Sequence, residues 1–520
     1  MKQWELYSGE ENTAVPGPTP VIPGEAVTEE VSADVAVVGE GLAGLCAALS
    51  ARQAGADTII VTASSGPVGR GGSVFASYSK VMAERGIPRQ DLSDFVLQEF
   101  AANSFLIDQR KWYTLIDRSE EAMDWLVDIV RAAGCDAVLE DANEADHNSP
   151  TYQPPGTHAF VSKDISRAGI GMPLALKALE ERYVSLGGRI IRRSPARLLE
   201  KTGRRVVGLL AQREDGGYIR VRAGKAVILA TGDFSADPAM MKKYCPSYAG
   251  YFDCRGDNYD VGFSMGGLFR GEGHRLAMWA GAAWQRTWPC AVMVQGSRKG
   301  TNLPYGSHRG LRVNNRGERY CNEDMNGAYT ALTTMREPGG EAFAIWGSNY
   351  ARDIRFRAHG GRRDGPDTPP EKVIESWDAM AEQGKIVKAD TLEEVISALG
   401  LPRERTFETI CRYNQMCVEG RDRDFHKKPE YLQQIREAPF YGASLSDRYF
   451  FSVMGGPRTN WKMQICDEND EPIPGLYCVG SMVGDMYANC YDFRIPGQNY
   501  GASLTFGYLT GRRVAEEETV

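Results

Sequence analysis

The sequence predicts an α/β protein in which a parallel-sheet domain is interrupted by an α+β insertion. Residues 33–61 contain an apolar strand, a glycine-rich turn, a helix and a second strand, the order of a βαβ unit. Apolar runs typical of buried strands return at 226–232 and 475–480. Charge rises between about 290 and 440, so we expect both chain ends to form one lobe and the middle to form an insertion.

The predicted elements follow in order along the chain. Residues 1–30 carry four prolines and predict an irregular arm. The first strand is expected at 33–38, a helix ends before Gly55, and the second strand covers 58–61. Residues 92–187 are predicted to be mainly helical, with breaks at prolines.

Residues 189–231 alternate apolar and polar positions and predict antiparallel strands that feed a core strand. A helix is expected from Leu392 to Leu399 after a start signal at Asp390 and Thr391. Glycines near residue 360 predict a flexible loop, and a last helix is expected at about 500–517. The expected segments are an arm (1–32), the sheet domain (33–289), the insertion (290–442) and the rest of the sheet domain (443–520).

Composition excludes several classes of protein. The 520 residues are 42% hydrophobic and carry a net charge of −8, which argues against nucleic acid as a partner. No apolar run is long enough to predict a membrane span, and no signal peptide is apparent, so we expect a cytoplasmic protein. The eleven cysteines include no C-x-x-C, and the six histidines show no ligand spacing, so no metal is expected.

The turn after the first strand carries the pattern G-x-G-x-x-G at Gly39, Gly41 and Gly44. The first glycine permits a tight turn, the second lets a pyrophosphate approach the backbone, and the third permits close helix–strand packing. The helix that follows would direct free N–H groups at the anion. The turn therefore predicts a bound dinucleotide, although the second strand ends in Thr62 rather than the usual ribose-binding carboxylate.

A second glycine-rich segment, Gly69–Ser73, follows the second strand and includes Arg70. Its glycines, cation and hydroxyl suit a loop that wraps a pyrophosphate, and a plain surface loop is the alternative.

Many motifs follow one another in the order known from one family. They are Val38–Gly44, Gly71–Ser73, Ala230–Phe234, Gly271–Gly273, Ala280–Ala282, Val313–Asn314, Gly317–Glu323, Thr409, Arg412–Asn414, Met454–Gly456, Pro474–Tyr477 and Gly480. Over residues 33–515 the chain resembles the flavoprotein of fumarate reductases and succinate dehydrogenases. The resemblance implies a Rossmann-like FAD-binding domain, interrupted by a mobile capping domain that closes over the flavin.

The resemblance also implies the residues of the FAD site. Members that attach FAD covalently use a histidine after the second strand, and residues 68–80 contain none, so non-covalent FAD is expected. The last helix is expected to direct its N-terminus at the flavin's pyrimidine edge. The expected FAD-binding residues are Gly39, Gly41, Leu42, Ala43, Gly44, Thr62, Ala63, Arg70, Gly71, Gly72, Ser73, Ser77, Arg197, Ala230, Thr231, Gly232, Gly480, Asn499, Gly501, Ser503 and Leu504.

The family's residues for fumarate are mostly missing. The proton-donating arginine falls on Gly327, with Tyr329 as the nearest titratable replacement, and the carboxylate-binding histidine falls on Ser452. Arg494 is the one substrate-binding arginine with a match. Arg494 is therefore predicted to orient substrate and Tyr329 to supply a proton. Weaker catalytic candidates are Tyr491, His308, Asp492 and Asp485.

Aromatic residues, including Trp288, Tyr487, Tyr491 and Tyr500, occupy the regions that lost polar groups, and they favour a flat, neutral, phenolic or polycyclic substrate. The predicted function is hydride transfer between flavin N5 and such a molecule, as in the stand-alone reductases of gut anaerobes that act on an isoflavan. NAD(P)H or a separate protein is the expected electron donor. The alternatives are an enone or 3-ketosteroid reductase or dehydrogenase, and a flavoprotein subunit of an electron-transfer complex.

Overall fold

The computed structural model divides the chain into two compact units. Unit 1 comprises residues 1–141, 154–292 and 452–520, and unit 2 comprises 142–153 and 293–451. Side chains at 293–296, 327–330 and 447–451 are not described. The structure describes residues 15–69, 71–140, 153–165, 171–248, 269–296, 310–324, 327–352, 369–445, 447–492 and 494–518.

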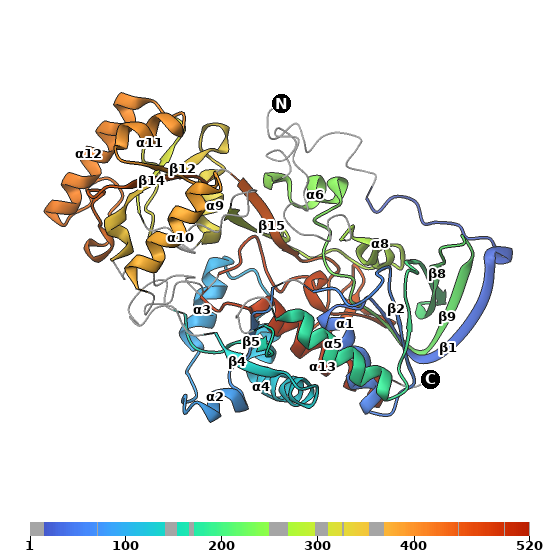
Figure 1. The fold of residues 1–520 in the computed structure, drawn as a ribbon. Helices are drawn as coiled ribbons and strands as arrows, with labels where there is room; N and C mark the ends of the chain where they lie inside the picture. Colours follow the sequence, from blue (N-terminus) through green and yellow to red (C-terminus); the bar gives the residue numbers. More distant parts are fainter. Residues whose placement is uncertain are drawn as a thin grey trace. The chain divides into compact units, whose positions relative to one another are not determined.

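Unit 1 is built on a sheet whose longest path has the order β16-β17-β9-β1-β2-β6, with a hairpin, β7–β8, that joins the edge of β9 (Figure 1). Strands β17, β9, β1, β2 and β6 pair in parallel, whereas β16 and the hairpin pair antiparallel. The bounds are β1 Val27–Val38, β2 Thr58–Val61, β6 Arg189–Ile191, β7 Ala196–Thr202, β8 Arg205–Gln212, β9 Tyr218–Leu229, β16 Gln464–Cys466 and β17 Pro472–Cys478. The predicted α/β class is confirmed.

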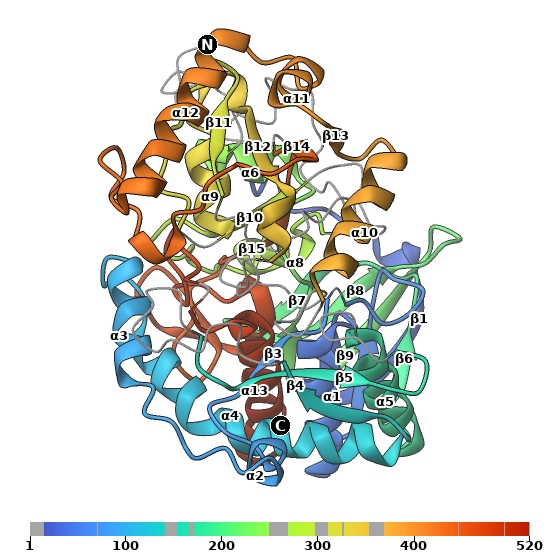
Figure 2. The ribbon, with the colours of Figure 1, turned by 60° about the vertical axis from the view of Figure 1, so that its left-hand side comes forward.

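The central strands are apolar without alternation because both faces of the sheet are covered. Val35–Val38 of β1, all of β2, and Ala226–Leu229 of β9 are buried. Figures 1 and 2 show helices α1 and α13 side by side. The helices of unit 1 are α1 Leu42–Gln53, α2 Lys80–Glu84, α3 Ser93–Ala102, α4 Gln109–Ala132, α5 Met172–Ser185, α6 Pro238–Tyr244, α8 Glu272–Trp279 and α13 Gln498–Glu517.

Two sequence predictions differ from the structure. The first strand begins at Val27 rather than Ala33, because residues 27–33 pair with β9 although most of them are polar and partly exposed. The region predicted to be mainly helical contains a small antiparallel sheet, β3-β5-β4, which pairs residues distant in sequence. The last helix, expected at about 500–517, covers Gln498–Glu517 and is confirmed. The bounds of the small sheet are β3 Val74–Phe75, β4 Asp136–Leu139 and β5 Thr157–Val161.

Unit 2 contains an antiparallel sheet of order β11-β12-β14-β13 with helices around it (Figure 2). The predicted start of the helix at residue 392 is confirmed, since Thr391 and Glu394 form a capping box. The predicted flexible loop near residue 360 lies outside the described residues. The bounds are β11 Arg312–Asn314, β12 Ala342–Gly347, β13 Val387–Ala389, β14 Phe440–Ser444, α9 Gly327–Thr334, α10 Pro370–Glu382, α11 Leu392–Ala398 and α12 Arg403–Glu419.

Two strands, β10 (Cys290–Gly296) and β15 (Asp447–Met454), pair with each other where the chain passes from one unit to the other. Within the described ranges, no helix has the length and apolar character needed to cross a membrane.

Candidate functional site

The turn between β1 and α1 leaves no room for side chains at two of its glycines. A Cβ on Gly39, where φ is +111°, would lie 2.3 Å from the Ala230 carbonyl oxygen, and a Cβ on Gly44 would lie 2.1 Å from that of Gly39. At Gly41 the nearest atom to such a Cβ is the Val68 carbonyl oxygen, 3.4 Å away. Two glycines thus serve packing, and the third gives a ligand close access to the backbone.

The N-cap residue of helix α1 is Gly41, which has no side chain to cap the first N–H groups, and the first turn of α1 carries no acid. Leu42 and Ala43 are buried in this turn. An uncapped helix N-terminus after a glycine turn is suited to bind an anion.

The motif residue between the first two glycines, Glu40, is buried and ion-paired with Arg192, whose Nε donates to Glu40 Oε2 at 3.1 Å. Arg192 also pairs with Glu180 of α5. The Glu40 carbonyl oxygen accepts from Val68 N at 3.2 Å. Glu40 therefore fixes the turn against the residue that follows β6, a role that local patterns could not predict because Arg192 is 152 positions away.

Thr62 follows β2 at the predicted ribose position, and its hydroxyl lies 2.7 Å from Ser64 Oγ. Its backbone N–H donates to the Ile191 carbonyl, so the end of β2 is fixed to β6. Ala63 is exposed beside it. Ser64 was not among the predicted residues, although a hydroxyl three positions after the strand is a recognisable turn signal.

The predicted loop residues have different environments. Gly71 has φ +68° and accepts a hydrogen bond from Met172 N, whereas Ser73 Oγ donates to Glu140 Oε1 at 2.9 Å. Ser77 Oγ donates to the Ile116 carbonyl of α4 at 2.6 Å, so this hydroxyl already has a protein partner. Gly72 is buried, and Arg70 lies outside the described residues.

The segment after β9 lies against the start of α8. A Cβ on Gly273 would lie 2.1 Å from Thr231 Oγ1, and Gly232 has φ +79°. On β7, Arg197 Nε donates to Gln212 Oε1, and its Nη1 lies 4.0 Å from Glu272 Oε1. Burial raises the pKa of Glu272, and the charges of Arg197 and neighbouring arginines oppose this shift.

Asp233 is a buried acid in the segment that follows β9, and its hydrogen bonds join this segment to the end of β15. It accepts hydrogen bonds from Val453 N at 3.0 Å and from Ser235 Oγ at 2.8 Å. Ser452 Oγ lies 3.5 Å from Asp233 Oδ2. The position that the resemblance assigns to a carboxylate-binding histidine is thus occupied by a hydroxyl beside an acid.

The N-cap residue of helix α13, Gly497, is also a glycine without a capping side chain. Gly497 has φ +79°, and its Cβ would lie 2.9 Å from Ser73, so the start of α13 lies close to the predicted loop. A Cβ on Gly501 would lie 2.4 Å from the Phe75 carbonyl oxygen. Ser503 Oγ donates to the Asn499 carbonyl, and Leu504 is buried.

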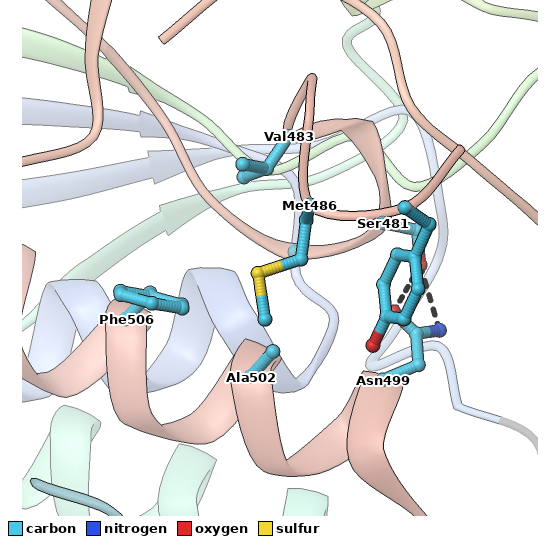
Figure 3. Close-up of a pocket in the computed structure, with 8 residues that line it drawn as sticks. Ser481, Val483, Met486, Asn499, Ala502 and Phe506 are labelled. Carbon is cyan, nitrogen blue, oxygen red and sulfur yellow. Dashed lines mark hydrogen bonds between the residues drawn. The ribbon is translucent and has the colours of Figure 1, made fainter. Parts of the chain in front are cut away.

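A small pocket lies between α13 and the segment that follows β17 (Figure 3). Asn499 Nδ2 donates to Ser481 Oγ at 3.1 Å, while Met486 extends toward Ala502 of the helix. The lining residues are Gly480, Ser481, Val483, Met486, Tyr487, Asn499, Ala502 and Phe506. Gly480 and Asn499 were predicted, and Ser481 was missed although it follows a motif glycine.

The structure describes the side chains of four of the six catalytic candidates, namely Arg494, Tyr491, Asp492 and Asp485. Arg494 is half-buried, its guanidinium lies 5.1 Å from the centre of the Phe95 ring, and its Nε has no hydrogen-bond partner. Its backbone N–H donates to Asp492 Oδ1. Tyr491 Oη accepts from Asn499 N at 3.5 Å. His308 and the Tyr329 side chain lie outside the described part of the chain.

The weaker candidate Asp485 is buried, and its Oδ1 accepts from Arg286 N. Asp485 therefore has a structural partner in unit 1. Among the described residues, no group of three or more His, Cys, Asp or Glu could hold a metal ion.

A family model described as an FAD binding domain matches residues 34–492. The chain belongs to the FAD-binding flavoproteins of the fumarate reductase and succinate dehydrogenase family. FAD is the cofactor of this flavoprotein, and the flavoprotein is an oxidoreductase.

Three curated relatives cover most of this flavoprotein. It is 29% identical to a vinyl phenol reductase of Lactiplantibacillus plantarum, over 93% of this chain and 97% of the relative. It is 24% identical to a cytochrome-type fumarate reductase of Shewanella frigidimarina, over 93% and 77%. It is 25% identical to a 3-oxosteroid 1-dehydrogenase of Mycolicibacterium smegmatis, over 93% and 97%.

The fold is shared with a solved 3-ketosteroid-Δ4-(5α)-dehydrogenase from Rhodococcus jostii RHA1. The TM-score is 0.72 at 24% identity, and the match covers 96% of this chain and all of that chain.

The residues of unit 1 fit FAD. Helices α1 and α13 are each preceded by a glycine that offers no capping side chain, and glycines without space for a Cβ lie near both helix starts. A dinucleotide carries the anionic pyrophosphate that such a turn binds.

Proposed function

We propose that this flavoprotein is an FAD-dependent reductase of a neutral, phenolic or polycyclic small molecule. The observation that carries the proposal is the environment of Ser452. In place of a cationic or imidazole group, Ser452 presents a hydroxyl 3.5 Å from the buried carboxyl group of Asp233. An acid at this point disfavours a substrate carboxylate, because like charges repel strongly where water is excluded.

The FAD site is proposed to use the predicted residues of unit 1. The first turn of α1 would bind the pyrophosphate, and the first turn of α13, with Asn499, would face the flavin's pyrimidine edge. When bound, FAD supplies hydride transfer at its N5 atom. We expect FAD to be held without a covalent bond, since residues 68–80 contain no histidine.

Arg494 is proposed to orient the substrate. Its Nε is buried without a partner, so it can donate to an oxygen of a ligand. Burial lowers the pKa of Arg494, and the charge of Asp492 opposes that shift. Tyr329 is proposed to supply the proton, because a neutral phenol donates readily at neutral pH.

The relative named for a vinyl phenol supports reduction of a carbon–carbon double bond conjugated with a phenol. A narrower form of the proposal is reductive removal of the hydroxyl group of tetrahydrodaidzein to give equol, which is also a phenolic substrate. A 3-oxosteroid or enone substrate is the second candidate, favoured by the 3-oxosteroid 1-dehydrogenase that matches 93% of this chain.

The test uses the purified holoprotein, reduced by light under anaerobic conditions and then mixed with single acceptors. The acceptors are 4-vinylphenol, tetrahydrodaidzein, a 3-oxosteroid and fumarate. We expect a phenolic acceptor to reoxidise the flavin fastest. Preference for the steroid would select the second candidate. If the reduced flavin passes electrons only to an added redox protein, the protein would instead be a flavoprotein subunit of an electron-transfer complex.

Two substitutions test the residues. Arg494→Ala and Tyr329→Phe are each expected to slow reoxidation by the best acceptor at least tenfold, a change of about 1.4 kcal/mol. Arg204→Ala is the matched control, because Arg204 is exposed and pairs with Asp467 on the surface. Full turnover of both variants, with FAD bound, would refute the residue roles.

A further inference from the structure

A buried acid lies directly beneath the first turn of α13. Glu99 of α3 is 1% exposed, and Gln498, the first residue of α13, is fully buried. Gln498 Nε2 lies 2.7 Å from the Asp492 carbonyl oxygen and 3.3 Å from Glu99 Oε2. Asn103 Nδ2 donates to Glu99 Oε1 at 3.1 Å. Glu99 therefore contacts both the start of α13 and the segment that precedes it.

No cation faces Glu99 within the part of unit 1 that the structure describes. Its nearest charged neighbour is another acid, Asp492, which is 7% exposed and whose backbone N–H lies 3.5 Å from Glu99 Oε1. The other titratable groups that face Glu99 are Tyr487, Tyr491 and Cys290, which carry no positive charge in any protonation state. Two acids in such a site cannot both ionise without a large energetic cost.

A second observation concerns the Gln498 amide. Its Oε1 is buried and has no hydrogen-bond donor. Buried acceptors nearly always have a hydrogen-bond donor. None of the neighbouring N–H groups that the structure describes donates to Gln498 Oε1, so this oxygen requires another donor. A protonated Glu99 carries an O–H group beside the same amide, so it supplies a donor there while Gln498 Nε2 keeps its bond to the Asp492 carbonyl oxygen.

We propose that Glu99 is a positioning residue that keeps a proton, donates it to Gln498, and so holds the first turn of α13 and the segment carrying Arg494 in place. This inference rests on the proposed function, in which that turn faces the flavin. A neutral Glu99 leaves the positive end of the α13 dipole free for the negative charge of a reduced flavin.

The upward shift of the Glu99 pKa agrees with a protonated carboxyl group at this position. Burial, and then the charge of Asp492, raises the pKa of Glu99 well above 4.5, and the three long N–H contacts offset only part of this rise. A raised pKa means that the folded state binds the proton more tightly than the unfolded state. Stability from this group is complete below pH 4.5 and falls as the pH rises toward the folded-state pKa.

The decisive comparison is Glu99→Gln against Glu323→Gln, with thermal and urea unfolding measured from pH 5 to pH 8. Glutamine imitates a protonated glutamate. We expect Glu99→Gln to match the wild type at pH 5 and to be the more stable protein at pH 8, by about tenfold in the unfolding constant per unit of pKa shift. Glu323 is a buried glutamate that contacts Arg319 and Lys427, so Glu323→Gln should be the less stable protein at pH 8.

If Glu99→Gln loses stability at pH 8 as Glu323→Gln does, Glu99 is ionised and the proposal is wrong. Asp492→Asn gives an independent result: removing the neighbouring charge should shift the fall in stability to lower pH. In the holoprotein, the midpoint potential of FAD should change with pH equally in Glu99→Gln and in the wild type wherever Glu99 keeps its proton, and a steeper change in the wild type would show that Glu99 ionises there and contradict the proposal. A colourless protein that keeps the unfolding contrast would refute the proposed function but not the acid pair.

Discussion

Three buried glutamates show how the partner, more than burial, decides the behaviour of an acid. Glu40 pairs with Arg192, Glu99 faces Asp492, and Glu323 lies between Arg319 and Lys427. Burial opposes ionisation of Glu323, but the charges of Lys427 and Arg319 outweigh it and hold its pKa below the ordinary value. We therefore expect Glu99 to be neutral and Glu323 to be charged.

The network around Glu323 predicts that Lys427→Met lowers the free energy of unfolding substantially. Lys427 Nζ lies 3.3 Å from Glu323 Oε2, and both side chains are fully buried. Removing one cation from this buried network costs about 3–5 kcal/mol, since Arg319 alone would remain to compensate the two acids Glu323 and Asp422. The loss should shrink below pH 4.5, where Glu323 can take up a proton. Lys388→Met, at a partly exposed pair with Asp378, should cost less than about 1 kcal/mol in the same urea titrations.

The glycines of the β1–α1 turn predict separable effects on folding and on FAD. Gly39→Ala should prevent stable folding, because its Cβ would collide with the Ala230 carbonyl at 2.3 Å. Gly41→Ala has space and should fold, but its methyl group would occupy the approach of the pyrophosphate and weaken FAD binding at least tenfold, about 1.4 kcal/mol. Bound FAD per chain and the melting temperature measure these effects. Wild-type FAD content in Gly41→Ala would contradict the assignment.

At the scale of elements, the contact between α1 and α13 positions both uncapped helix starts. Cβ atoms on Gly507 and Gly511 of α13 would lie 2.6 Å and 2.1 Å from the carbonyl oxygens of Ala43 and Ala47. Small residues therefore allow the two backbones to approach closely.

This contact predicts that Gly511→Ala destabilises unit 1 by about 1–3 kcal/mol, through overpacking. The direction is informative, because glycine to alanine in a helix interior otherwise stabilises by about 1 kcal/mol. Gly24→Ala, where a Cβ meets no atom within 4 Å, is the control. Increased stability of Gly511→Ala in urea unfolding would show that α1 and α13 are not in close contact.

Local signals predicted some elements well and others poorly. The glycine turn, the end of α1 before Gly55 and the capping box at Thr391 depend on neighbouring residues, and the structure confirms them. The start of β1 and the strands β4 and β5 depend on partners far along the chain, so the local pattern misplaced them. The same distinction holds at the site. Motif glycines were found, whereas Arg192, Ser481 and Glu99 gain their roles only from the fold.

At the scale of the whole molecule, the protein is a flavoprotein, and we propose that its FAD site lies in unit 1 and that its substrate is neutral. The family and the cofactor follow from the match over residues 34–492, and the substrate class is a proposal based on the acid beside Ser452.

The most direct measurement is stopped-flow reoxidation of the photoreduced holoprotein by 4-vinylphenol, tetrahydrodaidzein and fumarate, each at the same concentration. The account predicts a yellow protein that releases its FAD on denaturation and is reoxidised by a phenolic acceptor much faster than by fumarate. Fastest reoxidation by fumarate would contradict the central claim.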